Sequence, residues 1–304
     1  MFGFINLNKP AGFTSHDCIA KLRKFLNTRK IGHGGTLDPA ATGVLPVAVG
    51  KATRLLQFLP EPKAYRALIR LGVTTTTDDL EGEVIKSVAE VNLEPEEITA
   101  ALNNFVGTIE QVPPIYSAIK QKGKKLYELA RKGEDIAVEP RIITITKIEL
   151  LNIYRADFYE LEVKIHCGSG TYIRAIARDL GQMLGVGGTL ANLVRTESCG
   201  MQLENSITLE QIASQLQQQT FALISPSLVF NHLERVTLAE EESIRWCQGQ
   251  LIDLAAATTC MQPYPIKENS YLVTYRADQA FLGISILIQR DNIFKLKPKI
   301  VLHQ

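Results

Sequence analysis

The sequence predicts an α+β fold, because segments with helical spacing and segments with strand character alternate irregularly along the chain. Residues 141–154 and 158–170 are two long runs rich in β-branched residues, joined through Arg155–Asp157, which is typical of an antiparallel hairpin. From about residue 229 the pattern changes to one helix and several short strands. We therefore expect two domains, residues 1–228 and a small β-rich domain of residues 229–304.

The N-terminal elements follow from hydrophobic spacing. Residues 2–10 read as a strand that ends in a turn, and a helix follows with Thr14 or Ser15 as its N-cap. The apolar residues of that helix keep helical spacing: Cys18, Ile19, Leu22, Phe25 and Leu26. Residues 31–43 contain too many glycines for a regular element and are expected to form a loop.

Further along, a buried strand (44–50), a short helix (51–59) and an alternating strand (63–72) are expected. Three later helices are predicted within residues 93–107, 171–185 and 239–250. The first has Pro95 in its first turn, and the second ends at Gly185.

The cysteines and the apolar runs bound the class of protein. The five cysteines are widely spaced without a C-x-x-C pair, so neither a disulfide framework nor a zinc site is indicated. The N-terminus lacks the basic segment of a signal peptide, and no apolar run approaches the roughly 18 residues of a membrane span. We expect a cytoplasmic protein with no membrane contact.

Charge is distributed unevenly although the net charge is only +1. Residues 1–70 carry 11 Lys and Arg against 3 acids, whereas residues 71–119 carry 1 Lys against 9 acids. A second basic run, residues 120–133, holds six Lys and Arg, among them Lys124 and Lys125. This run can bind phosphates, or it can be a solvated helix with its preceding loop.

Several familiar sites are excluded by spacing. The segment VAVGKAT has Ala52 where a phosphate-binding loop needs Ser or Thr, and the glycine at 43 stands too far away. The histidines show no i, i+4 pairing with acids that would indicate a metal. The adjacent acids Asp78 and Asp79 could serve acid–base chemistry or bind a cation, but their order before a glycine favours a structural turn.

Asp38 is the best candidate for chemistry. It lies in a loop that is restricted by Pro39 and preceded by Gly34 and Gly35, which allow another backbone to approach closely. A carboxylate held in this way suits a nucleophile that attacks a sugar carbon or a base ring. The alternative is an acid that accepts hydrogen bonds from the amides of its own loop.

Four segments carry a family resemblance: GHGGTLDPAATGVLPVAVGKATR, KAYRALIRLGVTTTTDDLEGEV, PPIYSAIKQKGKKLYELARKG and IHCGSGTYIRAIARDLG. In this order they resemble the signature blocks of the bacterial tRNA pseudouridine synthases of the TruB type, which modify uridine 55 in the T loop. The likeness spans about residues 2–215. Family members often carry Thr in place of Gly34 and Leu in place of Ala40, which concerns the rigidity of the loop.

The resemblance implies a reaction and the residues that carry it. Asp38 matches the nucleophile, and Arg174 matches the cation that keeps the desolvated acid ionised. Tyr65 matches the aromatic residue that lies against the target base, and Tyr172 and Leu193 match positions that line the uridine pocket. Uridine isomerisation consumes no water and involves no net redox change, so no metal or coenzyme is expected.

RNA contacts are also implied. The target uridine must be extruded from its stack before the acid reaches it. His33 matches a contact to the RNA beside that site. The basic segment Lys120–Lys132, with Lys124 and Lys125, falls where these enzymes carry an insertion that folds over the RNA stem. By analogy, residues 229–304 are expected to form a PUA-like domain, although Glu240, Glu241 and Glu242 give it an acidic helix.

The resemblance implies a catalytic domain with a mixed, largely antiparallel sheet and flanking helices. The expected function is isomerisation of uridine 55 in tRNA by a monomer that requires no protein partner. Three alternatives stay open: a non-catalytic tRNA-folding chaperone, a glycosidase-like enzyme that releases the base, and a guide-RNA-dependent pseudouridylase subunit.

Overall fold

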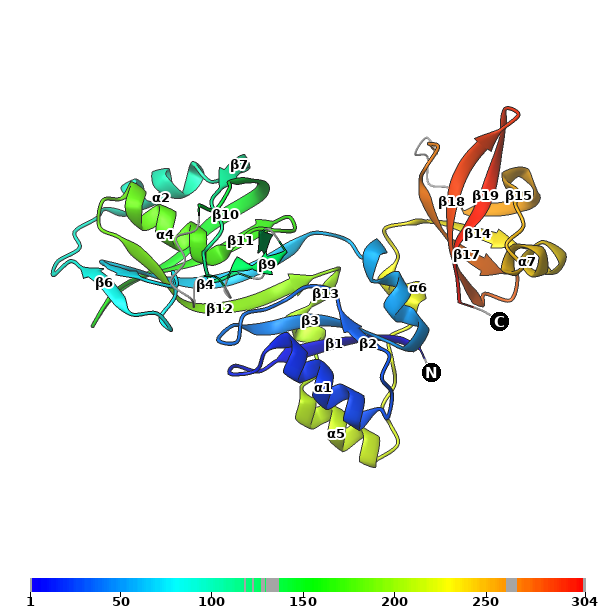
Figure 1. Cartoon of the computed structure of the whole chain (residues 1–304), viewed down its shortest axis with the longest axis horizontal. Helices are drawn as coiled ribbons and strands as arrows, with labels where there is room; N and C mark the ends of the chain where they lie inside the picture. Colours follow the sequence, from blue (N-terminus) through cyan, green and yellow to red (C-terminus); the bar gives the residue numbers. More distant parts are fainter. Residues whose placement is uncertain are drawn as a thin grey trace.

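A sheet of nine strands organises the N-terminal part of the computed structural model, which describes residues 2–117, 119–121, 123–126, 129, 137–260 and 267–302 (Figure 1). Its strand order is β1 (Gly3–Lys9), β3 (Thr42–Val49), β12 (Gly188–Ser198), β4 (Lys63–Leu71), β11 (Tyr159–Cys167), β10 (Arg141–Arg155) and β7 (Gly107–Gln111). Two short strands, β2 (Ile31–His33) and β13 (Met201–Gln202), pair with β3 and β12. Only the β3–β12 pairing within this sheet is parallel, so the predicted fold class is confirmed.

Helices cover different parts of this sheet. α2 (Pro95–Asn103) and α4 (Ile173–Met183) pack on the apolar face of β4, β10 and β11, while α1 (Ser15–Phe25) and α5 (Leu209–Gln217) pack against β1 and β3 (Figure 1). Along β4 and β11, buried apolar residues alternate in part with half-buried or exposed ones, whereas β1 and β3 are buried almost throughout. The core therefore lies between the sheet and its helices.

Local predictions can be compared with these elements. The hairpin of β10 and β11 is present, with Arg155 opposite Tyr159. Thr14 is the N-cap of α1, and Asp17 completes a capping box. Phe25 was expected on the buried stripe of α1, but it is 37% exposed because it lies at the last position of the helix.

Two further segments differ in detail. Residues 31–43 were expected to be a loop throughout, but Ile31–His33 pairs with β3 as strand β2. The short helix expected at residues 51–59 is the 3₁₀ helix η1 (Gly50–Phe58). The loop that carries Asp38 is therefore confined between β2 and β3.

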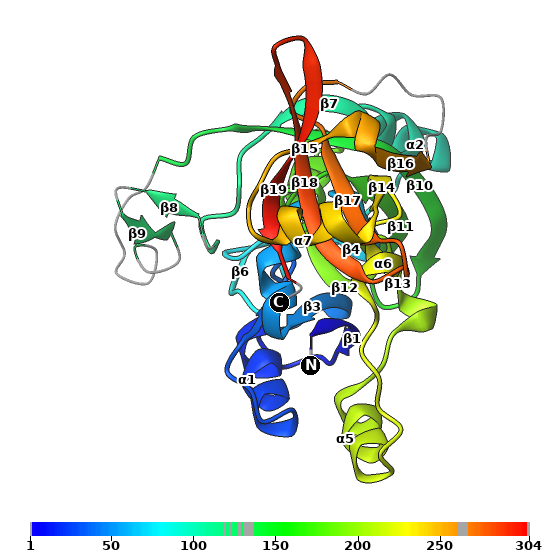
Figure 2. The ribbon, with the colours of Figure 1, turned by 90° about the vertical axis from the view of Figure 1, so that its right-hand side faces the viewer.

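A second sheet forms the C-terminal domain. Its order is β15 (Ile252–Asp253), β19 (Ile293–Val301), β18 (Phe281–Arg290), β17 (Tyr271–Arg276), β14 (Glu234–Leu238) and β16 (Ala257–Cys260). The helix α7 (Glu240–Cys247) buries Trp246 against it, and η3 (Leu254–Ala256) follows β15. Figure 2 shows this domain from the front, with the short hairpin β8 (Lys120–Gln121) and β9 (Lys124–Lys125) at the side of the molecule.

The two domains share an apolar cluster. Phe4, Leu55 and Phe58 pack with Tyr275 and Ile300, and α6 (Pro226–Val229) lies beside them. Lys51 and Arg54 of η1 donate hydrogen bonds to the carbonyls of Leu302 and Val301 at 3.2 and 2.9 Å. The C-terminal domain is therefore packed onto the N-terminal one, while a boundary between residues 228 and 229 stays a prediction.

Two smaller elements complete the description: the hairpin of β5 (Val73–Thr75) and β6 (Val84–Ser87), and the 3₁₀ turn η2 (Leu203–Asn205). Among the residues that the structure describes, no helix has the length and apolar character needed to cross a membrane.

Candidate active site

The loop that carries Asp38 is fixed from below by buried polar groups. The Ser15 hydroxyl accepts a hydrogen bond from the Leu37 amide at 2.9 Å, at the first position of α1. Lys9, which is fully buried at the end of β1, donates to the carbonyls of Pro10, Phe13 and Pro39 at 2.7 to 3.1 Å. The backbone on both sides of Asp38 is therefore held in one conformation.

Arg195 is the second buried cation under this loop. Its side chain on β12 donates to the carbonyls of Val44, Thr36 and Gly35 at 2.7, 3.2 and 3.2 Å, and only 1% of the residue is exposed. Gly43 allows this approach, because its φ is +102° and a Cβ there would collide with the backbone of Arg195. Sequence reasoning missed both residues. Lys9 is a cation at the end of an apolar strand, and Arg195 is a cation inside one.

Arg174 reaches the loop from the first turn of α4. The helix lies directly against β12. Gly181 permits this close approach, since a Cβ at its position would collide with the backbone of Gly188. Its start is anchored by the side-chain amide of Gln111, which donates to the Tyr172 carbonyl at 3.1 Å and accepts from the Tyr172 amide at 2.9 Å. The position of Arg174 is thus set by helix packing and by an anchored helix start.

The guanidinium of Arg174 binds four oxygens from three separate segments. Its Nη2 lies 2.9 Å from Oδ2 of Asp38 and donates to the Tyr116 carbonyl at 3.1 Å, while its Nη1 donates to the Thr77 carbonyl at 3.1 Å. Nη1 lies 3.6 Å from a carboxylate oxygen of Asp79. Its Nε is buried and has no hydrogen-bond partner among the described residues.

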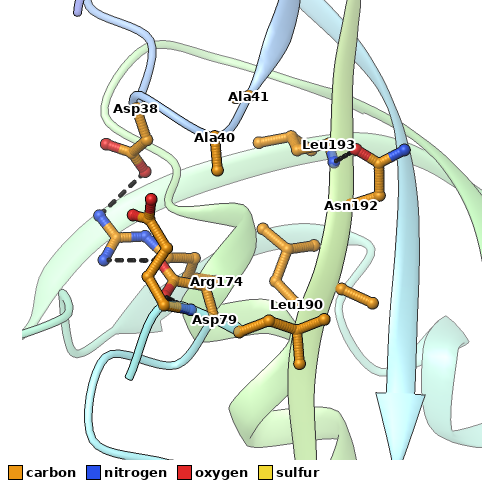
Figure 3. A pocket seen from close by; sticks show the side chains of 11 residues that line it. Asp38, Ala40, Ala41, Asp79, Arg174, Leu190, Asn192 and Leu193 are labelled. Atoms are coloured by element: carbon orange, nitrogen blue, oxygen red, sulfur yellow. Dashed lines mark hydrogen bonds and ion pairs between the residues drawn. The ribbon is translucent and has the colours of Figure 1, made fainter. Parts of the chain in front are cut away.

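A pocket opens beside this ion pair (Figure 3). Asp38, Asp79 and Arg174 form its polar side, and apolar side chains including Ala41, Leu190 and Leu193 form the other. A charged pair next to an apolar wall suits a flat heterocycle joined to a polar sugar. The acid was expected to be largely desolvated, but 42% of its side chain is exposed, because the pocket leaves the loop open on that side.

Tyr65 lies behind the loop on β4, opposite Arg195 in the sheet register. It is 6% exposed and packs with Leu37 and Ala41, and it does not line the pocket of Figure 3. Burial raises the pKa of its phenol, and the nearby Arg195 charge partly opposes this shift. The phenol is therefore protonated at neutral pH.

The other predicted pocket residues are distributed around the loop. Leu193 lines the pocket and is 9% exposed, whereas Tyr172 and His33 do not line it. His33 accepts a hydrogen bond from the Gly35 amide at 3.4 Å and packs edge-on against His16. Burial lowers the pKa of His33, and the charges of His16 and Arg195 lower it further, so its ring is neutral at pH 7.

The basic segment is described only in part. The backbone of Lys124 and Lys125 forms β9, but their side chains lie outside the described residues, as do Lys122, Arg131 and Lys132. Their contact with RNA stays a prediction.

Asp78 and Asp79 need a correction. They do form the turn that the sequence indicates, with Asp78 at a φ of +61°. However, Asp79 also lines the pocket and pairs with Arg174, while Asp78 pairs with Arg178 at 2.9 Å. The interpretation as purely structural acids was therefore incomplete, because pairing with a helix about 100 residues away leaves no local sequence signal.

Within the described ranges, no group of three or more His, Cys, Asp or Glu side chains is arranged to hold a metal ion. The site is instead built from carboxylates around one guanidinium.

Comparison with known proteins assigns the site to a family. Residues 23–173 match the family model of the TruB family pseudouridylate synthase N-terminal domain, and residues 174–236 match that of the tRNA pseudouridylate synthase B C-terminal domain. The chain is 53% identical over 306 aligned residues to the tRNA pseudouridine synthase B of Gloeothece citriformis, covering 99% of this chain and 97% of that protein. This chain belongs to the TruB family. The protein of the same name from Microcystis aeruginosa is 50% identical, with both chains covered completely.

Two solved structures share the fold of this chain. A chain of an H/ACA ribonucleoprotein bound to a substrate RNA containing 2′-deoxyuridine superposes with a TM-score of 0.76 at 24% identity, covering 100% of this chain and 86% of that one. A chain of a Cbf5–Nop10–Gar1 complex gives a TM-score of 0.72 at 27% identity, covering 95% and 79%. The superpositions confirm the fold, while the family models and the relatives named tRNA pseudouridine synthase B confirm the predicted family and isomerase class.

Proposed function

We propose that this protein converts uridine 55 in the T loop of tRNA to pseudouridine, with Asp38 as the nucleophile. The observation that carries the proposal is the 2.9 Å ion pair of Asp38 and Arg174 at the polar side of a pocket with an apolar wall. Its tRNA substrate is supported by the relatives of 46 to 56% identity, which are named tRNA pseudouridine synthase B.

The chemistry fits the groups present. The bond from uracil N1 to the ribose C1′ breaks, the base turns, and C5 forms the new bond to C1′ while its proton leaves and N1 gains one. A carboxylate can form a transient covalent bond to the ribose or to the ring, and it is released unchanged. Arg174 presents its positive charge to Asp38 at 2.9 Å, and this guanidinium is oriented by Thr77, Tyr116 and Asp79 rather than by solvent.

The pocket residues hold the extruded uridine. Leu193 forms part of the apolar wall, and Tyr65 and Tyr172, which do not line the pocket of the free protein, are the aromatic residues that contact the base of the bound RNA. His33 is neutral at pH 7, so it meets the RNA as a hydrogen-bonding and stacking group rather than as a cation. Lys124 and Lys125 bind phosphates of the stem.

We further propose that the protein acts in the cytoplasm as a monomer, without a guide RNA or a protein partner. One solved structure with the same fold is a complex of three named proteins, Cbf5, Nop10 and Gar1. By contrast, the relative from Microcystis aeruginosa, which is 50% identical with both chains fully covered, is named as a tRNA pseudouridine synthase. The sequence similarity thus favours a protein that recognises tRNA by itself.

The test uses an unmodified tRNA transcript tritiated at uridine C5, with the purified protein alone in EDTA. Tritium leaves C5 when the new carbon–carbon bond forms. We expect release of one equivalent per tRNA by the wild type and by Asp157→Asn, an exposed control acid, and none by Asp38→Asn. A uridine 55→cytidine transcript labelled at its other uridines should release no tritium.

Other results would identify the alternatives. Tritium release by Asp38→Asn would show that the Asp38 carboxylate is not required for the reaction. Binding of tRNA without release by the wild type would indicate a chaperone or a missing guide RNA, and free uracil in the mixture would indicate a glycosidase-like reaction.

A further inference from the structure

Two arginines on α4 contact the same two segments. Arg174 and Arg178 are one helical turn apart and therefore lie on the same side of the helix. Arg174 binds the 75–82 turn through Thr77 and Asp79, and it binds the 112–117 segment through the Tyr116 carbonyl. Arg178 binds the same turn through Asp78 and the same segment through the Val112 carbonyl.

Arg178 is fully engaged in this arrangement. Its Nη1 donates to Asp78 Oδ2 at 2.9 Å, its Nη2 to the Val112 carbonyl at 2.8 Å, and its Nε to Asp179 at 2.8 Å. The side chains of Arg178 and Asp78 are 24% and 13% exposed. A pair with several directional hydrogen bonds and little solvent exposure fixes geometry more firmly than a surface ion pair does.

The partner of Arg178 is directly linked to the pocket. Asp78 has a left-handed φ of +61°, and its carbonyl accepts a hydrogen bond from the amide of Leu190, a residue of the pocket wall. The next residue, Asp79, pairs with Arg174 at 3.6 Å and lines the pocket. Any shift of this turn moves Asp79 and leaves Arg174 with an altered set of partners.

We propose that Arg178 is a positioning residue for the isomerisation: with Asp78 it fixes the 75–82 turn, so that Asp79 holds the Arg174 guanidinium toward Asp38. The inference rests on the proposed function. Arg178 does not line the pocket, so its proposed effect on the reaction is indirect and passes through the turn.

The experiment compares Arg178→Gln and Asp78→Asn with Arg70→Gln. Arg70 pairs with Glu160 at 2.8 Å with similar exposure, 19% and 16%, but it contacts neither the turn nor Arg174. We expect Arg178→Gln to lower kcat about tenfold, which corresponds to about 1.4 kcal/mol, with KM for tRNA changed less than about twofold. Asp78→Asn should behave alike, and Arg70→Gln should keep the wild-type kcat.

A second background separates positioning from general stability. In Asp79→Asn protein, adding Arg178→Gln should change kcat by less than about twofold, because the residue acts through Asp79. An equal tenfold loss in both backgrounds, or an unchanged kcat in Arg178→Gln despite a lowered Tm, would overturn the inference.

A readout without activity keeps the two proposals apart. The NMR signal of the Arg174 Nε–H group, which is buried and unpartnered, should shift in Arg178→Gln and stay in place in Arg70→Gln. If the wild type releases no tritium, the proposed function fails, and this signal alone decides whether Arg178 positions Arg174. An unshifted signal in Arg178→Gln would reject the positioning role.

Discussion

The Asp38 carboxylate lies 2.9 Å from the Arg174 guanidinium, yet 42% of the acid's side chain is exposed and only 6% of the arginine's. The pair is therefore asymmetric. Arg174 is held by the carbonyls of Thr77 and Tyr116 and by Asp79, whichever way Asp38 points. The cation is held in place by the protein, whereas the acid is partly exposed and lines the pocket.

Replacing Arg174 with Ala is expected to abolish turnover while leaving tRNA affinity nearly unchanged, because its partners are the acid and protein carbonyls rather than a phosphate. Tritium release and filter binding on the same preparations measure the two effects. Thermal unfolding confirms that the variant is folded, and Arg174→Lys serves as a second variant that keeps the charge. A loss of affinity as large as the loss of turnover would contradict this role.

Replacing Lys9 with Met is expected to destabilise the protein by about 3 kcal/mol, because three carbonyls lose a charged donor inside the core. Urea unfolding measures this free energy. Lys51→Met is the matched control, since Lys51 is exposed and donates to one carbonyl only. Equal stability of the two variants would mean that Lys9 does not hold the Asp38 loop.

Tyr65→Phe is expected to remove part of the loss of stability at alkaline pH. Burial raises the pKa of Tyr65 above its ordinary value of 10.0, so above pH 10 the unfolded chain ionises while the folded one stays neutral. The stabilising contribution is complete below pH 10 and declines as pH rises toward the raised pKa. Urea midpoints at pH 8 and 10.5 test this, and parallel declines for both proteins would contradict it.

His33→Gln is expected to reduce the loss of stability in mild acid. The pKa of His33 is lowered from 6.5, so below that pH the unfolded chain takes up a proton before the folded chain does. The contribution of neutral His33 to the free energy of unfolding is complete above pH 6.5 and is lost as the pH falls through the lowered pKa. Unfolding free energies at pH 7.5 and 5.5 measure the difference, and an unchanged pH slope would show that His33 is not the responsible group.

Replacing Lys124 and Lys125 with Ala is expected to weaken tRNA binding. The slope of the logarithm of the binding constant against the logarithm of the salt concentration should become less steep by about 1 for each lost phosphate contact. Binding at a series of salt concentrations gives the slope. Lys86→Ala, on the acidic stretch of residues 71–119, removes one positive charge and serves as the control for the single variants Lys124→Ala and Lys125→Ala. A slope equal to that of the wild type would return the segment to the interpretation as a solvated helix.

Much of the site could be predicted because its signals are local. The glycine-rich turn before Asp38 and Pro39 is visible in the sequence, and so is the amphipathic pattern that makes residues 173–183 a helix. The likeness to a family then connected Asp38 and Arg174 before any distance was known. The sequence contains no comparable signal for how much of a side chain is exposed to solvent. For this reason the expectation that Asp38 is largely desolvated was wrong.

The sequence by itself predicted most of the elements, the α+β class, the family and the candidate acid Asp38, because hydrophobic period, capping residues and short motifs depend on neighbours in the chain. Only the tertiary structure decided that Lys9 and Arg195 lie beneath the Asp38 loop, and that Asp78 and Asp79 pair with the two arginines of α4. These contacts join residues 30 to about 160 positions apart. Such pairs arise from the packing of strands and helices, which no local pattern records.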